Sequence, residues 1–288
     1  MATSEYPEFV SFTKTWHSAP YPLISPTRPE LLASGKNVVV TGGGTGIGYA
    51  IAKAFAQASA KSITIIGRRR DRLETAATKI SAIAPKETQI LYELADLQDH
   101  AQINNALATI VAKVGNVDLL VSSAGVLPQN GPIATYDPAA IRKSFEVNVI
   151  GTLNVIQAFA IYAGPDPTLI HVSSGTVHTR PIPEQGAYNA TKLAALKLVD
   201  QFCAENPKFH VVSLHPGWVA TEMNDMQAEA PDFPELPGSL AVWLASPEAK
   251  FLRGKLVWSN WDVGELLERA EEIKDSNLLN LILDGVSM

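Results

Sequence analysis

The chain of 288 residues contains a single cysteine, Cys203. One cysteine cannot form an intrachain disulfide, which excludes a disulfide-stapled scaffold and favours a reducing compartment. Stability must therefore come from a buried core, and a chain of this length can bury a sizeable one. Apolar residues make up 46% of the sequence and charged residues 18%, the proportions of a soluble globular protein.

Long basic blocks and long apolar runs are also missing. The net charge is −6, and the longest basic run is Arg68-Arg69-Arg70, so we expect neither nucleic-acid binding nor attachment to an anionic membrane. No uninterrupted apolar run approaches the roughly 18–20 residues of a membrane span. Residues 1–12 carry Glu5 and Glu8 in place of the basic and apolar regions of a secretory signal. A cytoplasmic protein is expected.

The histidines do not form a metal-binding pattern. His171, His178, His210 and His215 lack the spacing of metal ligands, so we expect no metal site. His215 precedes a proline and is interpreted as structural. For His178 two interpretations stay open, since it could line a substrate pocket or serve only the fold.

Short apolar runs alternate with amphipathic segments from Lys36 onward. The predicted strands are residues 37–42, 62–67, 89–94, 117–125, 168–174, 210–217 and 255–260. The predicted helices are residues 46–59, 71–83, 98–113, 138–162, 187–205 and 238–247. Runs this apolar suit strands covered on both faces. The alternation predicts an α/β fold with a doubly wound, parallel seven-stranded sheet and helices on both faces.

The first 34 residues differ from this pattern. Prolines recur between Pro7 and Pro29 and block regular helices, while the aromatic content argues against simple disorder. We predict an N-terminal arm, residues 1–34, that packs on the body or on a neighbouring subunit. Residues 35–288 then form one domain, because no internal linker interrupts them. Residues 259–273 have the pattern of an amphipathic helix, within a C-terminal helical tail at 262–288.

A glycine-rich turn, TGGGTGIG at 41–48, follows the first predicted strand and precedes an alanine-rich helix. Without side chains at Gly42, Gly46 and Gly48, the backbone can approach a pyrophosphate closely, and the helix amides would face the phosphates. A merely flexible loop is the alternative, but the position between strand and helix favours a dinucleotide site. The absence of Gly-Lys-Ser/Thr excludes a P-loop.

The end of the second predicted strand bears on the choice of dinucleotide. An NAD site usually places a carboxylate there to accept from the ribose 2′-hydroxyl. Here Gly67 is followed by three arginines, with no carboxylate before Asp71. We predict NADP rather than NAD, with Arg68 on the 2′-phosphate and the Thr45 hydroxyl as a second contact. The alternative is that the arginines are a solvated helix start.

Four further motifs follow in order: VNVIG at 147–151, HVSSG at 171–175, YNATK at 188–192 and HPGWVAT at 215–221. With the glycine turn, they make residues 36–260 resemble the short-chain dehydrogenase/reductase family. The resemblance implies a single Rossmann-like domain, a dinucleotide cofactor and a hydride-transfer reaction. The proline-rich arm resembles the N-terminal extension of some filamentous-fungal members.

Tyr188 and Lys192 stand one helical turn apart. A free tyrosine has a pKa near 10 and is a poor acid–base group at neutral pH. An ammonium group at i+4 shares its helix face and would stabilise the phenolate, which lowers that pKa. The resemblance implies that Tyr188 exchanges a proton with the substrate oxygen, that Ser174 hydrogen-bonds this oxygen, and that Lys192 also holds the nicotinamide ribose. Asn148 would hold a water in a proton relay.

The serine assignment has an alternative. The family serine is usually the second of such a pair, which favours Ser174, although it stands one residue farther from Tyr188 than usual. Ser173 is the other candidate.

The resemblance extends the cofactor site to further positions. These are Ile47 in the glycine turn, Asp96 and Leu97 after the third predicted strand, Ala124 and Gly125 after the fourth, and Val219 and Thr221 after the sixth. Asp96 would meet the adenine edge, or else cap the helix at 98–113. The family's usual Asn-Asn-Ala-Gly is replaced by Ser122-Ser123-Ala124-Gly125, which offers fewer hydrogen bonds to brace the sheet.

Residues 222–238 occupy the place of the family's variable substrate loop. Met223, Met226, Phe233 and Leu236 suit an apolar ketone or alcohol, although a surface lid without recognition is equally compatible. We predict an NADP-dependent oxidoreductase acting on a ketone or secondary alcohol, and the fungal resemblance suggests a secondary-metabolite substrate. The alternatives are a non-catalytic dinucleotide sensor, and a reductase that couples reduction to cyclisation or isomerisation. The family implies a homodimer or homotetramer built on 138–162 and 187–205.

Overall fold

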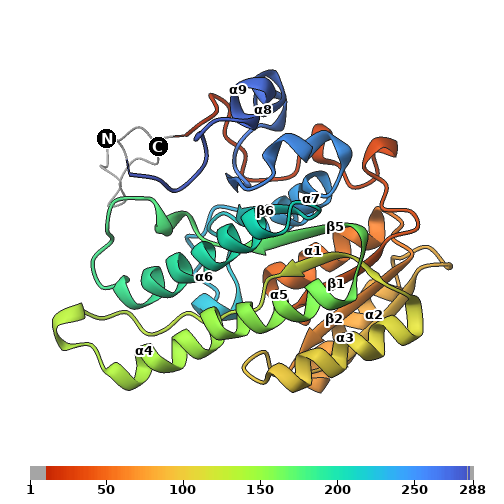
Figure 1. The fold of residues 1–288 in the computed structure, drawn as a ribbon, viewed down its shortest axis with the longest axis horizontal. Coiled ribbons are helices and arrows are strands. Elements are labelled where there is room, and N and C mark those ends of the chain that lie inside the picture. Colours follow the sequence, from red (N-terminus) through yellow and green to blue (C-terminus); the bar gives the residue numbers. More distant parts are fainter. Residues whose placement is uncertain (1–10, 284, 286–288) are drawn as a thin grey trace.

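The computed structural model describes residues 11–283 and 285, and within them a parallel sheet of seven strands forms the centre (Figure 1). The strands are β1 Asn37–Thr41, β2 Ser62–Gly67, β3 Gln89–Leu94, β4 Val117–Ser122, β5 Ala163–Val172, β6 His210–His215 and β7 Leu256–Trp258. Their order is β3-β2-β1-β4-β5-β6-β7, and every neighbouring pair is parallel. The predicted fold class is confirmed.

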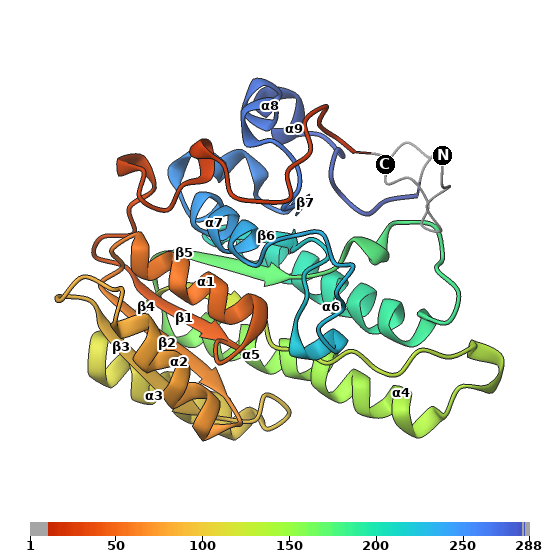
Figure 2. The same cartoon turned by 180° about the vertical axis from the view of Figure 1, so that it is seen from behind.

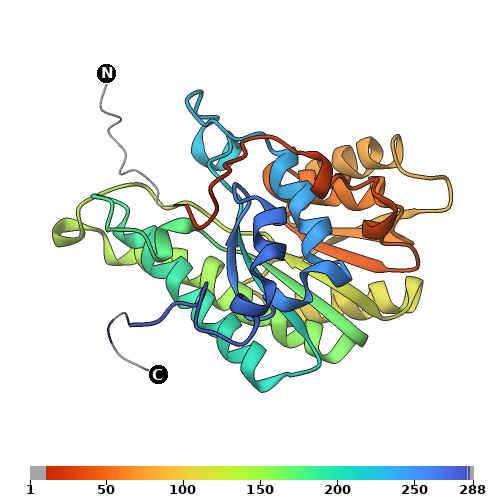
Figure 3. The ribbon, with the colours of Figure 1, turned by 90° about the horizontal axis from the view of Figure 1, so that it is seen from above.

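Helices cover both faces of the sheet. They are α1 Gly46–Gln57, α2 Arg70–Ser81, α3 His100–Val114, α4 Pro138–Phe145, α5 Gly151–Tyr162, α6 Gly186–Glu205, α7 Glu235–Leu244, α8 Val263–Glu268 and α9 Ala270–Lys274. In β1, Val38 and Val40 join the core beneath α1, α2 and α7, whereas Val39 joins the core beneath α3, α5 and α6. Figure 2 shows the first group in front of the sheet, and Figure 3 shows the two groups on opposite sides of the strands.

Side-chain caps determine where several elements begin. Asp99 accepts hydrogen bonds from the amides of Ala101 and Gln102, so α3 begins at His100. Asp262 accepts from the Glu265 amide, and the predicted C-terminal helix becomes the short pair α8 and α9. These acceptors satisfy amides that a helix start leaves unpaired.

The predicted helix at 138–162 is one continuous stretch, but a π-helical turn at Glu146–Ile150 separates α4 from α5. By length and mean hydropathy this stretch, Pro138–Tyr162, could cross a membrane, although no uninterrupted apolar run indicated it. Its most apolar window is 56% buried inside the fold, with Val155 and Phe159 in the core. This is the pattern of a core helix in a globular protein.

The described part of the arm packs on the C-terminal segment of the same chain. The arm, red in Figure 1, runs beside α8 and α9, which are blue. Trp16 forms an isolated bridge with Trp261, and His17 Nε2 lies 2.8 Å from an Asp262 oxygen. Residues 1–10 of the predicted arm, and residues 284 and 286–288 of the predicted tail, lie outside the described residues.

Tyr21 ties the arm to this segment through one hydroxyl. The hydroxyl donates to the carbonyl of Trp261 at 3.1 Å and accepts from the amide of Val263 at 2.8 Å. Val263 is fully buried, so its amide has no ready substitute for this acceptor.

We predict that Tyr21→Phe lowers the free energy of unfolding by about 1–3 kcal/mol, the usual penalty for a buried group that loses its partner. Urea denaturation of purified protein measures this difference. Tyr92→Phe is the matched control, because the Tyr92 hydroxyl donates to the exposed Glu74 carboxylate, and its expected effect is below about 0.5 kcal/mol. Equal changes in the free energy of unfolding would show that the Tyr21 hydroxyl stabilises the fold no more than the exposed Tyr92 hydroxyl does.

Candidate active site

The glycine-rich turn is built without room for side chains. Gly42 and Gly46 have φ values of +70° and +55°, a region that favours glycine. A Cβ on Gly48 would lie 2.4 Å from the carbonyl oxygen of Gly42, and a Cβ on Gly42 would lie 2.9 Å from Cα of Ala124. Thr45 is the N-cap of α1, yet in the described structure its side chain caps none of the helix amides. These amides open toward the turn and suit the pyrophosphate of a dinucleotide.

A cavity of about 250 Å³ extends from this turn along the carboxyl ends of the strands. It spans the point where the strand order reverses, between β1 and β4, which is where open α/β sheets bind their ligands. Thirteen predicted site residues line it: Gly42, Thr45, Gly46, Ile47, Gly48, Arg68, Asp96, Leu97, Ala124, Gly125, Tyr188, Lys192 and Thr221. Asn148, Ser174 and Val219 lie beside lining residues rather than in the described lining.

The lining also contains residues that the sequence analysis did not assign to the site. These are Gly44, Gly67, Arg69, Arg72, Leu73, Ser123, Val147, Val172, Pro216 and Glu222. Most lie inside the quoted motifs or beside predicted positions, which was the available signal. Glu222, like Asp96, brings a carboxylate into a cleft otherwise suited to an anion.

Tyr188 and Lys192 project from the first turns of α6 on one face. The Lys192 ammonium lies 5.9 Å from the centroid of the Tyr188 ring and donates to the carbonyl of Val172 at 2.9 Å. Ser174 lies near enough to Tyr188 to oppose the rise of the tyrosine pKa, which is consistent with its predicted place beside the tyrosine.

Burial dominates the protonation of this pair. It raises the pKa of Tyr188 to about 12, although the hydrogen bond from Ser174 opposes the shift. It also lowers the pKa of Lys192 to about 8. The expectation that the ammonium lowers the tyrosine pKa is therefore not met, because loss of hydration disfavours the charged form of each group. At neutral pH Tyr188 is a phenol, able to donate a proton.

Ser173 and Ser174 have different surroundings. Ser174 caps a short 3₁₀ turn at Gly175–Val177, and its hydroxyl lies 2.9 Å from that of Thr176. Ser173 lines the cavity, and its buried hydroxyl has no hydrogen-bond partner within the described part of the chain. An unpaired buried hydroxyl at the cavity wall is a ready contact for a ligand.

Asn148 lies in the π-helical turn between α4 and α5, a feature often found at functional sites. Its side chain accepts from the amide of Val126 at 2.8 Å and donates to the carbonyl of Val126 at 2.9 Å. It also donates to the Thr191 hydroxyl at 3.0 Å. Asn148 thus joins the turn after β4 to α6, and its predicted water-holding role stays a prediction.

The turn after β4 is braced in spite of the serine replacements. The Thr41 hydroxyl accepts from the amides of Ser123 and Ala124 at 3.1 and 3.2 Å. This threonine on β1 therefore supplies the hydrogen bonds that the missing asparagines put in doubt.

Each arginine of the basic run meets a carboxylate. Arg68 lies 3.5 Å from Asp96, Arg69 lies 3.3 Å from Glu222, and Arg70 lies 3.7 Å from Glu74. Arg72, two residues beyond the run, lies 3.0 Å from Glu222. Burial alone would raise the pKa of Asp96, but hydrogen bonds from Gln98 and the charge of Arg68 hold it below the ordinary value. Asp96 does not cap α3, since Asp99 does.

The residues after β6 form the wall opposite the arginines. Thr221 and Asn224 form a reciprocal capping box, and the Thr221 methyl group would lie 3.3 Å from a Cβ on Gly46. Val219 is 3% exposed, and its carbonyl accepts from Asn224.

The apolar residues of the predicted substrate loop separate into two groups. Met223, Met226 and Phe233 are 45%, 59% and 60% exposed, whereas Leu236 is fully buried in α7. Leu236 belongs to the core and is not available to a substrate, because the helix begins three residues earlier than predicted.

His178 and His215 surround one tryptophan. His178 Nε2 accepts from the indole N–H of Trp258 at 2.9 Å, and the His215 ring packs edge-on at 4.3 Å. Burial lowers the pKa of His215 to about 3, so it is neutral. These contacts agree with a structural role for His215 and give His178 a structural partner, outside the described cavity lining.

Known sequences of one family match most of the length of this chain. A family model described as short chain dehydrogenase matches residues 36–232. The short chain dehydrogenase/reductase AacuD of Aspergillus aculeatus is 34% identical, covering 96% of this chain and 98% of that protein. The short chain dehydrogenase citE of Monascus ruber is 35% identical, covering 96% and 97%.

Solved structures share the fold. A short-chain dehydrogenase/reductase from Serratia marcescens is 26% identical with a TM-score of 0.71, covering 78% of this chain and 96% of its own. An alcohol dehydrogenase from Thermococcus sibiricus, complexed with 5-hydroxy-NADP, is 26% identical with a TM-score of 0.69, covering 77% and 95%. The order of the motifs, the sheet and the matches agree: the chain belongs to the short-chain dehydrogenase/reductase family of oxidoreductases, which bind a nicotinamide cofactor.

Proposed function

We propose that the protein is an NADP(H)-dependent oxidoreductase that transfers a hydride between the nicotinamide and a ketone or secondary alcohol. One observation carries this proposal: Tyr188 and Lys192 line the same cavity as the glycine-rich turn. A proton donor and a site for a dinucleotide are thereby brought together in one cleft.

In this mechanism the bound nicotinamide supplies or accepts the hydride. During reduction the Tyr188 hydroxyl donates its proton to the substrate oxygen, and the O–H bond of the phenol breaks as the new O–H bond forms. The Ser174 hydroxyl donates to the same oxygen and orients it. Lys192 stabilises the phenolate that remains, and Asn148, bonded to Thr191, keeps the catalytic helix in position.

The preference for NADP rests on the cations at the end of β2. Arg68, Arg69 and Arg72 line the cavity, and Arg69 Nη2 lies 3.5 Å from the Thr45 hydroxyl. Guanidinium groups beside a hydroxyl suit a phosphate monoester. Burkholderia cenocepacia and Thermococcus sibiricus relatives of this fold were solved with NADP or a derivative of it.

The proposed substrate is apolar. Met223 lines the cavity, and Met226 and Phe233 follow it on the same exposed loop. Flexible apolar side chains at a cavity mouth adapt to a hydrophobic ketone. The relatives from Aspergillus and Monascus agree with the resemblance to fungal members of the family, on which the proposal of a secondary-metabolite substrate rests.

Tyr188→Phe is expected to abolish the proton transfer while leaving the cofactor contacts in place. Turnover with a panel of hydrophobic ketones should fall by about 10²–10⁴-fold, the usual contribution of a positioned acid. Nicotinamide fluorescence should show unchanged NADPH binding, tighter than that of NADH. Full turnover in the variant would refute the assigned role, and a protein without turnover in either form would favour a dinucleotide sensor.

The pH dependence should follow Lys192. Because its pKa is about 8 and that of Tyr188 about 12, the phenol stays protonated while the ammonium is lost above pH 8. We expect the kcat of ketone reduction to be flat between pH 6 and 7 and to fall above pH 8. Lys192→Arg keeps its charge in this range, so its residual activity should not fall.

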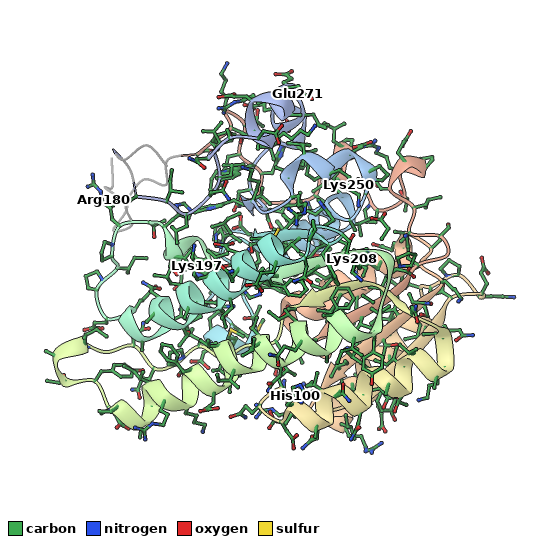
Figure 4. All side chains as sticks on the ribbon, viewed as in Figure 1. His100, Arg180, Lys197, Lys208, Lys250 and Glu271 are labelled. Carbon is green, nitrogen blue, oxygen red and sulfur yellow. The ribbon has the colours of Figure 1, made fainter. Side chains whose placement is uncertain are left out.

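The control for this profile is Lys197→Arg. Lys197 is exposed farther along α6 (Figure 4) and should keep the wild-type fall above pH 8. If the Lys192→Arg profile falls as steeply as the wild type, another group controls the alkaline limb.

We also propose a homodimer or homotetramer built on α4–α5 and α6. Ile150, Ile161 and Leu193 on these helices are 38%, 66% and 40% exposed, and apolar side chains on neighbouring helices favour burial by a partner. Sedimentation velocity at micromolar protein should show a species of at least twice the monomer mass. A purely monomeric profile would rule this out.

A further inference from the structure

The carboxylate of Glu222 links two chain segments that line the cavity. Glu222 belongs to the segment after β6, whereas Arg69 and Arg72 belong to the segment after β2. Arg69 Nη1 lies 3.3 Å from Oε2 of Glu222, and Arg72 Nη1 lies 3.0 Å from Oε1. Each guanidinium thus takes one oxygen of the same carboxylate, and all three residues line the cavity.

This carboxylate lies where an anionic ligand would find its charge partners. Arg69 Nη2 approaches the Thr45 hydroxyl at 3.5 Å, and a Cβ on Gly44 would lie 3.5 Å from Cβ of Arg72. The two guanidinium groups therefore lie beside the glycine-rich turn as well as beside Glu222. Glu222 occupies the place among them that a phosphate group would take.

We infer that Glu222 is a specificity-determining residue that competes with the 2′-phosphate of the cofactor for Arg69 and Arg72. This inference rests on the proposed binding of NADP(H). A phosphate dianion with three acceptor oxygens displaces the single carboxylate, whereas a dinucleotide without the 2′-phosphate brings no such group to the arginines. The Glu222 carboxylate therefore makes the preference for NADPH over NADH smaller than the arginines alone would give.

The ion pairs are weak enough to be exchanged. The side chains of Arg69, Arg72 and Glu222 are 56%, 48% and 43% exposed, so water screens their attraction. Removing the carboxylate should therefore change the NADPH preference by about three- to tenfold, the range that exposed pairs support.

The test compares Glu222→Gln with wild type by isothermal calorimetry, using NADPH and NADH as probes. The ratio of the NADH to the NADPH dissociation constant should rise about three- to tenfold in Glu222→Gln. The same ratio should fall in Arg72→Gln, which removes one of the two guanidinium groups proposed to bind the 2′-phosphate. Glu87→Gln makes the same charge change at an exposed site before β3, at the amino end of the sheet, and should leave the ratio unchanged.

A second pair of probes isolates the adenosine end of the site. Adenosine 2′,5′-bisphosphate should bind Glu222→Gln more tightly than wild type, and adenosine 5′-monophosphate should not. An unchanged or lower NADPH preference in Glu222→Gln overturns the inference and leaves the proposed function in place. A wild-type protein that binds neither NADPH nor NADH overturns the proposed function itself.

Discussion

The absence of a Cβ at Gly48 is the constraint on which the cleft depends. Because nothing stands between Gly48 and the Gly42 carbonyl, α1 begins immediately against β1. Gly42 in turn packs on Ala124, which brings the turn after β4 beneath the same cleft. The next residues of that turn are held by Asn148, whose amide also binds Thr191, which stands between Tyr188 and Lys192 on α6. A continuous series of contacts thus links the glycine-rich turn to α6.

The close packing around the cleft also affects the pKa values of Tyr188 and Lys192. Burial leaves Tyr188 and Lys192 poorly hydrated, so each shifts toward its neutral form. Poor hydration also strengthens electrostatic interactions, because few water dipoles screen them. In the proposed reaction the Tyr188 phenol would act as the acid, and the Lys192 ammonium would stabilise the phenolate once it has formed.

Most of the fold could be predicted from sequence because its signals are local. Short apolar runs marked the strands. The caps Asp99 and Asp262 were not predicted, although each stands next to the helix that it caps. The cavity residues next to a motif were likewise within reach. The ion pair of Glu222 with Arg69 was not, because the two residues lie 153 positions apart in the chain. The hydrogen bonds of Thr41 depend on which segments of the chain meet, and the pKa of Tyr188 depends on how deeply it is buried. A short sequence pattern contains neither kind of information.

The pairing of the arm with the C-terminal segment has a consequence for synthesis. The hydrogen-bond partners of Lys14, His17 and Tyr21 lie between residues 260 and 265. As the ribosome releases the chain from its amino end, these early residues have no docking surface until nearly all of the sheet has emerged. The first described segment to be translated therefore waits for partners that are made after β7.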